Sequence, residues 1–330
     1  MINEFNHSQF AHCESGVVST LLSHYGLEIS EPMAFGMTST LSFVFLPIVK
    51  LNNMPLIAYR DLPKNIVKNI EKILGVKVFK KQYKDIIEAN LELTKLVEDE
   101  KKLVGLQTSV FYLPYMPENM RFHFNAHNLL VYGKDGKNYK ISDPVFEDVV
   151  ECNEKDLTTA RFAKGVFAPK GFIYYPTYIP SNIDYVSILK KAIRKNAKSM
   201  LTPFPYAGVK GMRKLAKAIE KLQNNKDTRY IKNYLTHIVR MQEEIGTGGG
   251  GFRFLYAAFL QEAKKYDLDK EKLQKASELI TQSGDTLRLF ALKCVESAKK
   301  IEKFNAKEIS QILTQASFLE EEAFRILKSI

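Results

Sequence analysis

The feature of this sequence that most constrains its fold is a change of pattern near residue 180. Before that point, short apolar runs typical of strands alternate with segments whose apolar residues recur at helical spacing. After it, apolar residues recur at three- and four-residue intervals almost to the end of the chain. The Pro-bearing stretch 175–182 separates the two patterns. We therefore expect an α+β domain over residues 1–180 and an all-α helical domain over residues 181–330.

The individual elements are predicted from the same periodicities and from flanking turn residues. In the first domain, strands are expected at residues 41–49, 56–59, 103–110, 127–132, 138–142 and 171–175. Helices are expected there at 15–25, 64–74, 83–98 and 153–163. In the second domain, helices are expected at 185–198, 209–223, 228–245, 252–266, 269–282, 284–303 and 306–330.

The net charge of +11 is confined to the predicted helical domain. Residues 1–180 hold 20 basic and 20 acidic side chains, whereas residues 181–330 hold 28 and 17. Between Lys190 and Arg240, 14 basic residues face only Glu220 and Asp227. Like charges on one helix face repel and lower the stability of the helix, and an acidic partner would offset this repulsion. A basic face that is only solvated is an equal alternative. Nucleic acid is not expected, since no recognised binding motif accompanies the charge.

Cysteine usage and apolar runs limit the class of protein. The three cysteines are widely spaced and suggest no disulfide framework, which favours a reducing, cytoplasmic location. No run of eighteen apolar residues occurs, and the first residues lack a basic-then-apolar signal pattern, so neither membrane association nor secretion is expected.

Of the three cysteines, Cys13 has the position that most favours a reactive thiol. The helix expected at 15–25 follows it directly, with Gly26 placed to end that helix. At a helix N-terminus, free N–H groups and the macrodipole favour the thiolate form, which is the nucleophilic form. Cys152 and Cys294 are interpreted instead as small buried apolar residues.

A second group of residues completes a pattern of nucleophile, base and orienting acid. The strand expected at 127–132 begins at His127, the turn 134–137 contains Asp-Gly, and the next strand leads to Asp143. Because His127 and Asp143 lie 16 residues apart across one hairpin, pairing of its strands would bring them together. Cys13, His127 and Asp143 therefore form the candidate catalytic set. His123 lies four residues before His127, but no metal-binding motif supports a metal site, and none is expected.

This order of motifs resembles papain-like cysteine enzymes, especially the peptidases that trim bacteriocin leaders. More closely, His12-Cys13-Glu14-Ser15 and the segment 25–36 resemble butirosin biosynthesis protein H and its relatives, over residues 8–176. Relatives also carry a helical C-terminal domain with a glycine-rich segment, which residues 248–256 match. The resemblance implies a papain-like domain. His12 and Glu14, which flank Cys13, are taken as candidate substrate-binding residues.

Two departures from these relatives concern the glycines after Gly36 and the oxyanion donor. Where relatives continue with glycines, this chain has residues 37–43, which contain none. Papain uses a glutamine six residues before its nucleophile, and that position here is His7. Gln9 and Gln107 are the alternatives, so the oxyanion donor stays open among these three residues.

The glycine run 246–251 enters the helix expected at 252–266 and leaves backbone N–H groups bare, as anion sites often do. We take Gly249, Gly250 and Arg253 as candidate substrate-binding residues, on the hypothesis that they lie near Cys13 and hold a phosphate or an acceptor. A flexible helix connection is the plainer alternative. The Gly-Lys-Ser/Thr ending of a P-loop is missing, so a nucleoside triphosphate is not expected.

The resemblance implies an acyltransferase of secondary-metabolite or antibiotic biosynthesis. An acyl group would pass from an acidic acyl carrier protein, bound by the basic helical domain, through Cys13 to a small-molecule amine, without a cofactor. A cysteine peptidase, a thioester or amide hydrolase and a non-catalytic binding module all remain open. Also open are the acyl group, the acceptor, coenzyme A as an alternative donor, and the oligomeric state, a homodimer included.

Overall fold

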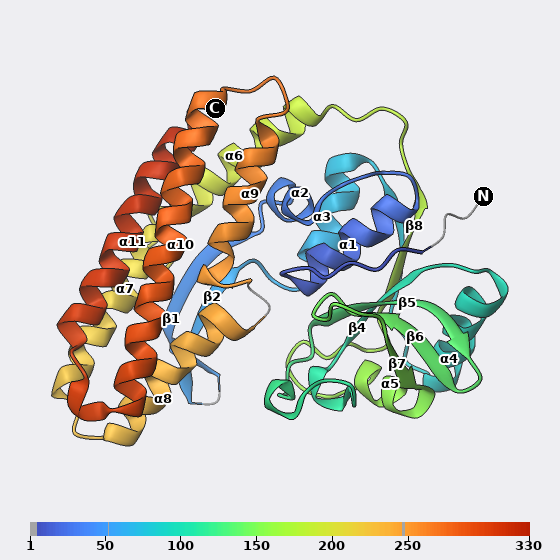
Figure 1. The fold of residues 1–330 in the computed structure, drawn as a ribbon, viewed down its shortest axis with the longest axis horizontal. Helices are drawn as coiled ribbons and strands as arrows, with labels where there is room; N and C mark the ends of the chain where they lie inside the picture. The colour runs from blue at the N-terminus through green and yellow to red at the C-terminus, as the bar shows by residue number, and fades with distance from the viewer. Residues whose placement is uncertain (1–4, 52, 246–247) are drawn as a thin grey trace. The chain divides into compact units, whose positions relative to one another are not determined.

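The computed structural model describes residues 5–51, 53–245 and 248–330, and the chain divides into two compact units (Figure 1). The first unit comprises Met1–Ala34 and Pro63–Ile183, and the second comprises Phe35–Leu62 and Asp184–Ile330. Helix α2 (Glu31–Met37) spans the division between them. The first unit is α+β and the second is largely helical, which confirms the predicted fold class.

A six-stranded antiparallel sheet forms the centre of the first unit, in the order β3-β8-β4-β5-β6-β7. Its strands are β3 (Lys77–Lys81), β4 (Val104–Thr108), β5 (His127–Asp135), β6 (Asn138–Ser142), β7 (Val150–Asn153) and β8 (Ile173–Tyr178). The tight connection between β5 and β6 places Gly136 at a φ of 55°, a backbone conformation that glycine adopts readily. This hairpin carries the candidate base and acid.

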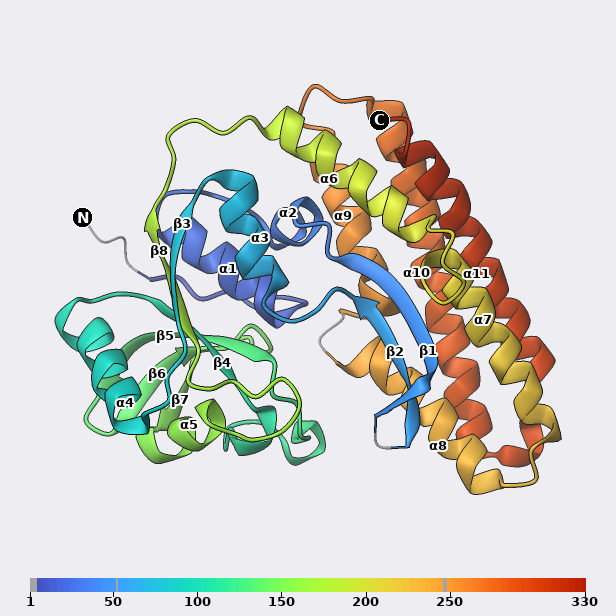
Figure 2. The same cartoon turned by 180° about the vertical axis from the view of Figure 1, so that it is seen from behind.

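Helices cover both faces of this sheet (Figure 2). On one face, α4 (Ile86–Thr94), the π-helix η1 (Lys95–Asp99) and α5 (Glu154–Arg161) pack on alternate strand residues to form an apolar core. On the other face, α1 (Cys13–His24) contacts β4, β5 and β8, with α3 (Asn65–Leu74) beside it. Val17, Val18, Leu21 and Leu22 bury the apolar side of α1.

The second unit packs helices around the hairpin of β1 (Leu41–Leu51) and β2 (Met54–Arg60). Its helices are α6 (Tyr185–Met200), α7 (Gly208–Lys221), α8 (Thr228–Val239), α9 (Arg253–Ala263), α10 (Lys270–Lys299) and α11 (Ala306–Leu327). The two longest, α10 and α11, lie side by side, with α7 against α11 (Figures 1 and 2).

Several short helical turns complete both units. They are η2 (Val110–Tyr112) and η3 (Glu118–Met120) in the first unit, and η4 (Leu222–Asn224), η5 (Arg240–Glu244), η6 (Gly250–Phe252) and η7 (Ile301–Lys303) in the second. Among the residues that the structure describes, no helix combines the length and apolar composition needed to cross a membrane.

The predicted assignment of residues 1–180 to one domain is wrong for the β1–β2 hairpin, which belongs to the second unit. Its inward side chains are buried there, and its backbone and side chains bond to the helical region. The Phe45 N–H donates to Tyr206 O at 2.9 Å, and Tyr59 Oη donates to Gln242 Oε1 at 3.0 Å. Strand pattern alone does not state which part of the chain a hairpin packs against.

Gly284 marks a second difference, because the sequence predicts a break between 282 and 284 where the structure has the continuous helix α10. A Cβ at Gly284 would lie 2.8 Å from Phe254 Cε1, so glycine here permits close packing inside a helix. Helix α2 and strands β3 and β7 were not predicted.

Candidate active site

Cys13 is the first residue of α1 and is 6% exposed. His12 has extended backbone angles and caps the helix, since its Nδ1 accepts from the Ser15 N–H at 3.3 Å. The first N–H groups of a helix have no intrahelical acceptor, and they point along the positive end of its dipole. The thiol therefore stands where an anion is stabilised.

The His127 and Asp143 side chains meet at the open end of the β5–β6 hairpin. His127 Nε2 lies 2.7 Å from Asp143 Oδ2, and both residues are buried. The same carboxylate oxygen accepts from Tyr115 Oη at 2.9 Å, while Oδ1 accepts from the Val145 N–H at 3.1 Å. Each oxygen of Asp143 therefore has a donor that fixes the carboxylate toward the imidazole.

The Cys13 thiol lies close enough to the His127 ring to raise the pKa of the imidazole. Since Asp143 takes Nε2 of the ring, Nδ1 is the nitrogen that remains for the thiol. Burial by itself would lower the pKa of His127, but the Asp143 carboxylate and the Cys13 thiol outweigh burial and raise that pKa to about 10. At neutral pH the imidazole is then protonated and held between Asp143 and the sulfur.

Four contacts join the segment before Cys13 to the segment that begins at Ser142. They are Phe10 N–H to Pro144 O at 2.9 Å, Gln9 Nε2 to Val145 O at 2.9 Å, His7 Nε2 to Phe146 O at 3.1 Å and His7 Nδ1 to Ser142 Oγ at 2.7 Å. The chain leading to the nucleophile and the chain leaving the acid thus run together, which fixes Cys13 relative to Asp143.

These contacts limit which candidate can serve as the oxyanion donor. Both ring nitrogens of His7 are engaged, one by Ser142 Oγ and one by Phe146 O. A carbonyl oxygen accepts only, so Nε2 carries the proton of neutral His7 and has no further N–H to offer. Gln9 is exposed and donates one of its two amide hydrogens to Val145 O, which leaves the other.

Gln107 lies on β4 with its side chain buried. Its Nε2 donates to Asn125 O at 2.6 Å and to Phe167 O at 2.9 Å, so both amide hydrogens are used within the protein. Of the three candidates, only Gln9 keeps an amide hydrogen that no described residue accepts.

His12 and Glu14, the candidate substrate contacts beside Cys13, are both buried. Glu14 Oε1 accepts from the Ile66 N–H at 3.0 Å and from the Val67 N–H at 3.4 Å, at the start of α3. Glu14 therefore links the first turn of α1 to the N-terminus of α3, and His12 caps α1. The structure gives both side chains roles in holding the backbone around Cys13.

The glycine-run candidates belong to the second unit, and Gly246 and Thr247 lie outside the described residues. The Gly250 N–H bonds the Glu243 carboxylate at 3.0 Å, so an acidic side chain of the protein occupies that donor. Gly249 has a φ of 84°.

Arg253 is fully buried and forms two bonds to Glu320, at 2.8 and 2.9 Å, and one to Gly251 O at 2.7 Å. Its charge is therefore neutralised inside the unit, contrary to the expectation that it meets a substrate.

Two residues of the site were not predicted from the sequence. Tyr115 holds Asp143, and Glu31 accepts hydrogen bonds from the backbone before Cys13. Neither stands within ten residues of its partner in the motif, and no local pattern marks either one. A tyrosine in a loop and a glutamate opening a helix are common, so only the folded chain identifies them.

The other two cysteines and His123 lie in surroundings that indicate packing roles. Burial raises the pKa of Cys152 to about 12, and burial also raises that of Cys294, so both thiols stay protonated. His123 stacks on Phe111 with ring centroids 3.9 Å apart.

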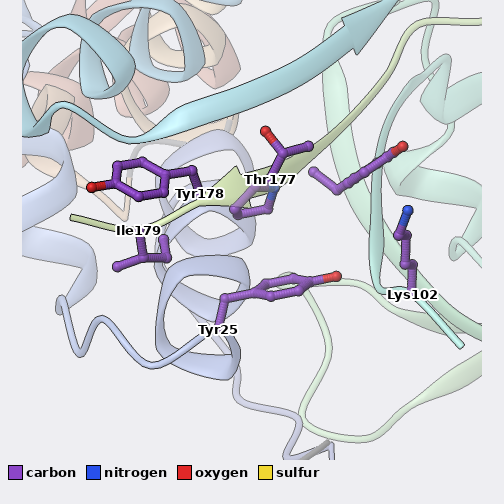
Figure 3. Close-up of a pocket in the computed structure, with 7 residues that line it drawn as sticks. Tyr25, Lys102, Thr177, Tyr178 and Ile179 are labelled. Carbon is purple, nitrogen blue, oxygen red and sulfur yellow. The ribbon is translucent and has the colours of Figure 1, made fainter. Parts of the chain in front are cut away.

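A pocket of about 520 Å³ lies beside Tyr25, the residue that caps the opposite end of α1 from Cys13 (Figure 3). Besides Tyr25 it is lined by Lys102 and by residues 175–179. Lys102 Nζ lies 2.6 Å from Glu100 and 4.7 Å from the centroid of the Tyr175 ring, so its charge is already compensated. This pocket is separate from the Cys13–His127–Asp143 group.

Tyr115→Phe tests the support of Asp143. Removing the hydroxyl takes one donor from a buried carboxylate oxygen, and we expect the free energy of unfolding in urea to fall by about 1–3 kcal/mol. Tyr112→Phe is the matched control, because Tyr112 is exposed and three residues away; it should change stability by less than about 0.5 kcal/mol. Equal effects of the two substitutions would show that the Tyr115–Asp143 bond contributes nothing.

Comparison with known proteins agrees with this geometry. The family profile described as the N-terminal part of butirosin biosynthesis protein H matches residues 12–144, which include Cys13, His127 and Asp143. A domain of unknown function, DUF4872, matches residues 155–327, more than half of the chain. Among curated proteins, none matches.

A crystal structure of a C39-like peptidase from Bacillus anthracis aligns with a TM-score of 0.38 and 14% identity, covering 54% of this chain and 96% of its own. The two profiles together account for nearly the whole chain, and the N-terminal one contains the Cys13–His127–Asp143 group. The chain therefore belongs to the butirosin biosynthesis protein H-like family, with an N-terminal domain of that family followed by a DUF4872 region.

Proposed function

We propose that the protein is a cysteine acyltransferase that moves an acyl group from a carrier thioester, through acyl-Cys13, to an amine. The observation that carries the proposal is the buried His127–Asp143 pair, with the Cys13 thiol close enough to the ring to raise its pKa. An imidazolium beside a sulfur at a helix N-terminus is the arrangement that keeps a cysteine nucleophilic.

In the first half-reaction, the Cys13 thiolate attacks the thioester carbonyl. The bond to the carrier sulfur breaks, and His127 gives its proton to the leaving thiolate. In the second half-reaction, an amine attacks acyl-Cys13, and the now neutral His127 takes the amine proton. The amide leaves and the thiolate–imidazolium pair returns, so protons and bonds balance over the cycle.

The tetrahedral oxyanion of each half-reaction needs donors beside the sulfur. The Cys13 backbone N–H is one, because it opens α1. Gln9 supplies the other in this proposal, since one of its amide hydrogens is not used by Val145 O. Asp143 holds the imidazole in orientation throughout.

An acidic carrier protein is the proposed donor, and α7 is its proposed docking surface. Lys210, Lys214, Lys217 and Lys221 follow one another at four- and three-residue intervals and are all exposed, so they form one stripe along α7. Among the described residues these four lysines form no ion pair. On α10, by contrast, Lys275 and Lys293 are each paired with a glutamate of α11. An uncompensated basic stripe fits an acidic partner.

The covalent step is tested by intact-protein mass after mixing with an acylated carrier protein. We expect an acyl adduct on the wild type, no adduct on Cys13→Ala, and loss of the adduct with amide formation when an amine is added. Loss of the adduct in buffer alone, at a rate that amines do not change, would instead indicate a hydrolase. Absence of any adduct on the folded wild type would contradict the proposal and favour a binding module.

The docking surface is tested by Lys214→Gln/Lys217→Gln. With the carrier-borne thioester at low salt, we expect kcat/KM to fall about fivefold to tenfold, and added salt should reduce the difference by screening. Turnover of a small thioester without a carrier should not change. Lys272→Gln/Lys275→Gln is the matched control, because both lysines lie on α10 and are paired with acids, Lys275 exposed and Lys272 half-buried. An equal kcat/KM for the carrier-borne thioester in the two variants would show that the carrier does not dock on α7.

A further inference from the structure

Glu31 is a buried carboxylate whose bonds lie on both sides of the nucleophile in sequence. Its Oε1 accepts from the His12 N–H at 2.7 Å and from Ser15 Oγ at 3.1 Å, and its Oε2 accepts from the Ala11 N–H at 3.0 Å. Ala11 and His12 precede Cys13, and Ser15 follows it. One side chain from a different segment therefore holds the turn that carries the Cys13 sulfur by three hydrogen bonds.

The chemistry of these contacts requires a carboxylate. Two of the three donors are backbone N–H groups, which cannot accept, so both Glu31 oxygens must present lone pairs. A glutamine of the same shape would direct an N–H group at one of these donors, and the hydrogen bonds accepted by that oxygen would be lost. Burial raises the pKa of Glu31, and the Ala11 and His12 N–H groups and the Ser15 hydroxyl oppose this by stabilising the ionised form.

A negative charge so close to a nucleophilic thiolate is unfavourable by itself. Like charges raise the free energy of the thiolate, so on electrostatic grounds Glu31 would make Cys13 less reactive. A carboxylate at this position favours reactivity if the geometry that it enforces contributes more than the repulsion costs. The two effects have opposite signs, and a substitution that removes the charge separates them.

We propose that Glu31 is a positioning residue for the nucleophile: it holds the turn at Ala11 and His12 so that the Cys13 sulfur meets the His127 ring. This inference rests on Cys13 being the reactive thiol of the proposed function. Glu31 does not touch substrate in this proposal; it acts only through the backbone of Ala11 and His12 and the hydroxyl of Ser15.

The test is the rate of Cys13 alkylation by iodoacetamide at pH 6 and pH 9, on wild type, Glu31→Gln, Glu31→Asp and Glu28→Gln. An unassisted thiol is mostly protonated at pH 6 and reacts slowly, so the pH 6 rate reports the thiolate–imidazolium pair. We expect Glu31→Gln to lower the pH 6 rate at least tenfold and to change the pH 9 rate much less. Glu28, three residues earlier and exposed, is the matched control and should leave both rates unchanged.

Glu31→Asp keeps the charge but retracts it by one methylene, and we expect a pH 6 rate between those of wild type and Glu31→Gln. If Glu31→Gln does not fold, as judged by circular dichroism, Glu31→Asp carries the test with Glu28→Asp as its control, and a drop of about threefold is expected. A pH 6 rate that is unchanged or higher in the folded variant would overturn the inference. A wild-type thiol no faster at pH 6 than a cysteine peptide would instead overturn the proposed function.

Discussion

The contact on which the site depends is the bond between His127 Nε2 and Asp143 Oδ2. A histidine buried as deeply as His127 would be neutral on its own, because burial disfavours the charged ring. The carboxylate of Asp143 reverses this preference, and the ring becomes a cation that can hold a thiolate. The pair exists because β5 and β6 form one hairpin, in which Leu130 lies opposite Ser142 and the base and acid fall at its open end.

The nucleophile reaches this pair through contacts that are distant in sequence. Residues 7–10 bond to residues 142–146, and Glu31 and Glu14 hold the turns on either side of the sulfur. Backbone and buried side-chain bonds of this kind lose their benefit unless all partners are in place, so the site is assembled only when the whole first unit has folded. Preorganisation of this sort is what a cysteine enzyme needs before substrate arrives.

The parts of this account that could be predicted are those that depend on local sequence. Cys13 at the start of α1 and His127 at the start of β5 follow from helical spacing, strand pattern and an Asp-Gly turn. What could not be predicted depends on the choice of distant partners. The β1–β2 hairpin has an ordinary strand pattern but packs with the helices. Arg253 follows a glycine run, as anion ligands often do, but its buried guanidinium is paired with Glu320. Tyr115 and Glu31 are likewise identified only by what they contact.

The most direct test of the central claim is nitrogen NMR of the His127 imidazole across a pH titration of the wild-type protein. With the pKa raised to about 10, both ring nitrogens should remain protonated from pH 6 to pH 8.5, with no titration step in that interval. In Asp143→Asn, the pKa of the His127 ring should fall, so that its titration step lies between pH 6 and pH 8.5. A wild-type ring that titrates near pH 6.5, as an unperturbed histidine does, would contradict the thiolate–imidazolium pair on which the mechanism rests.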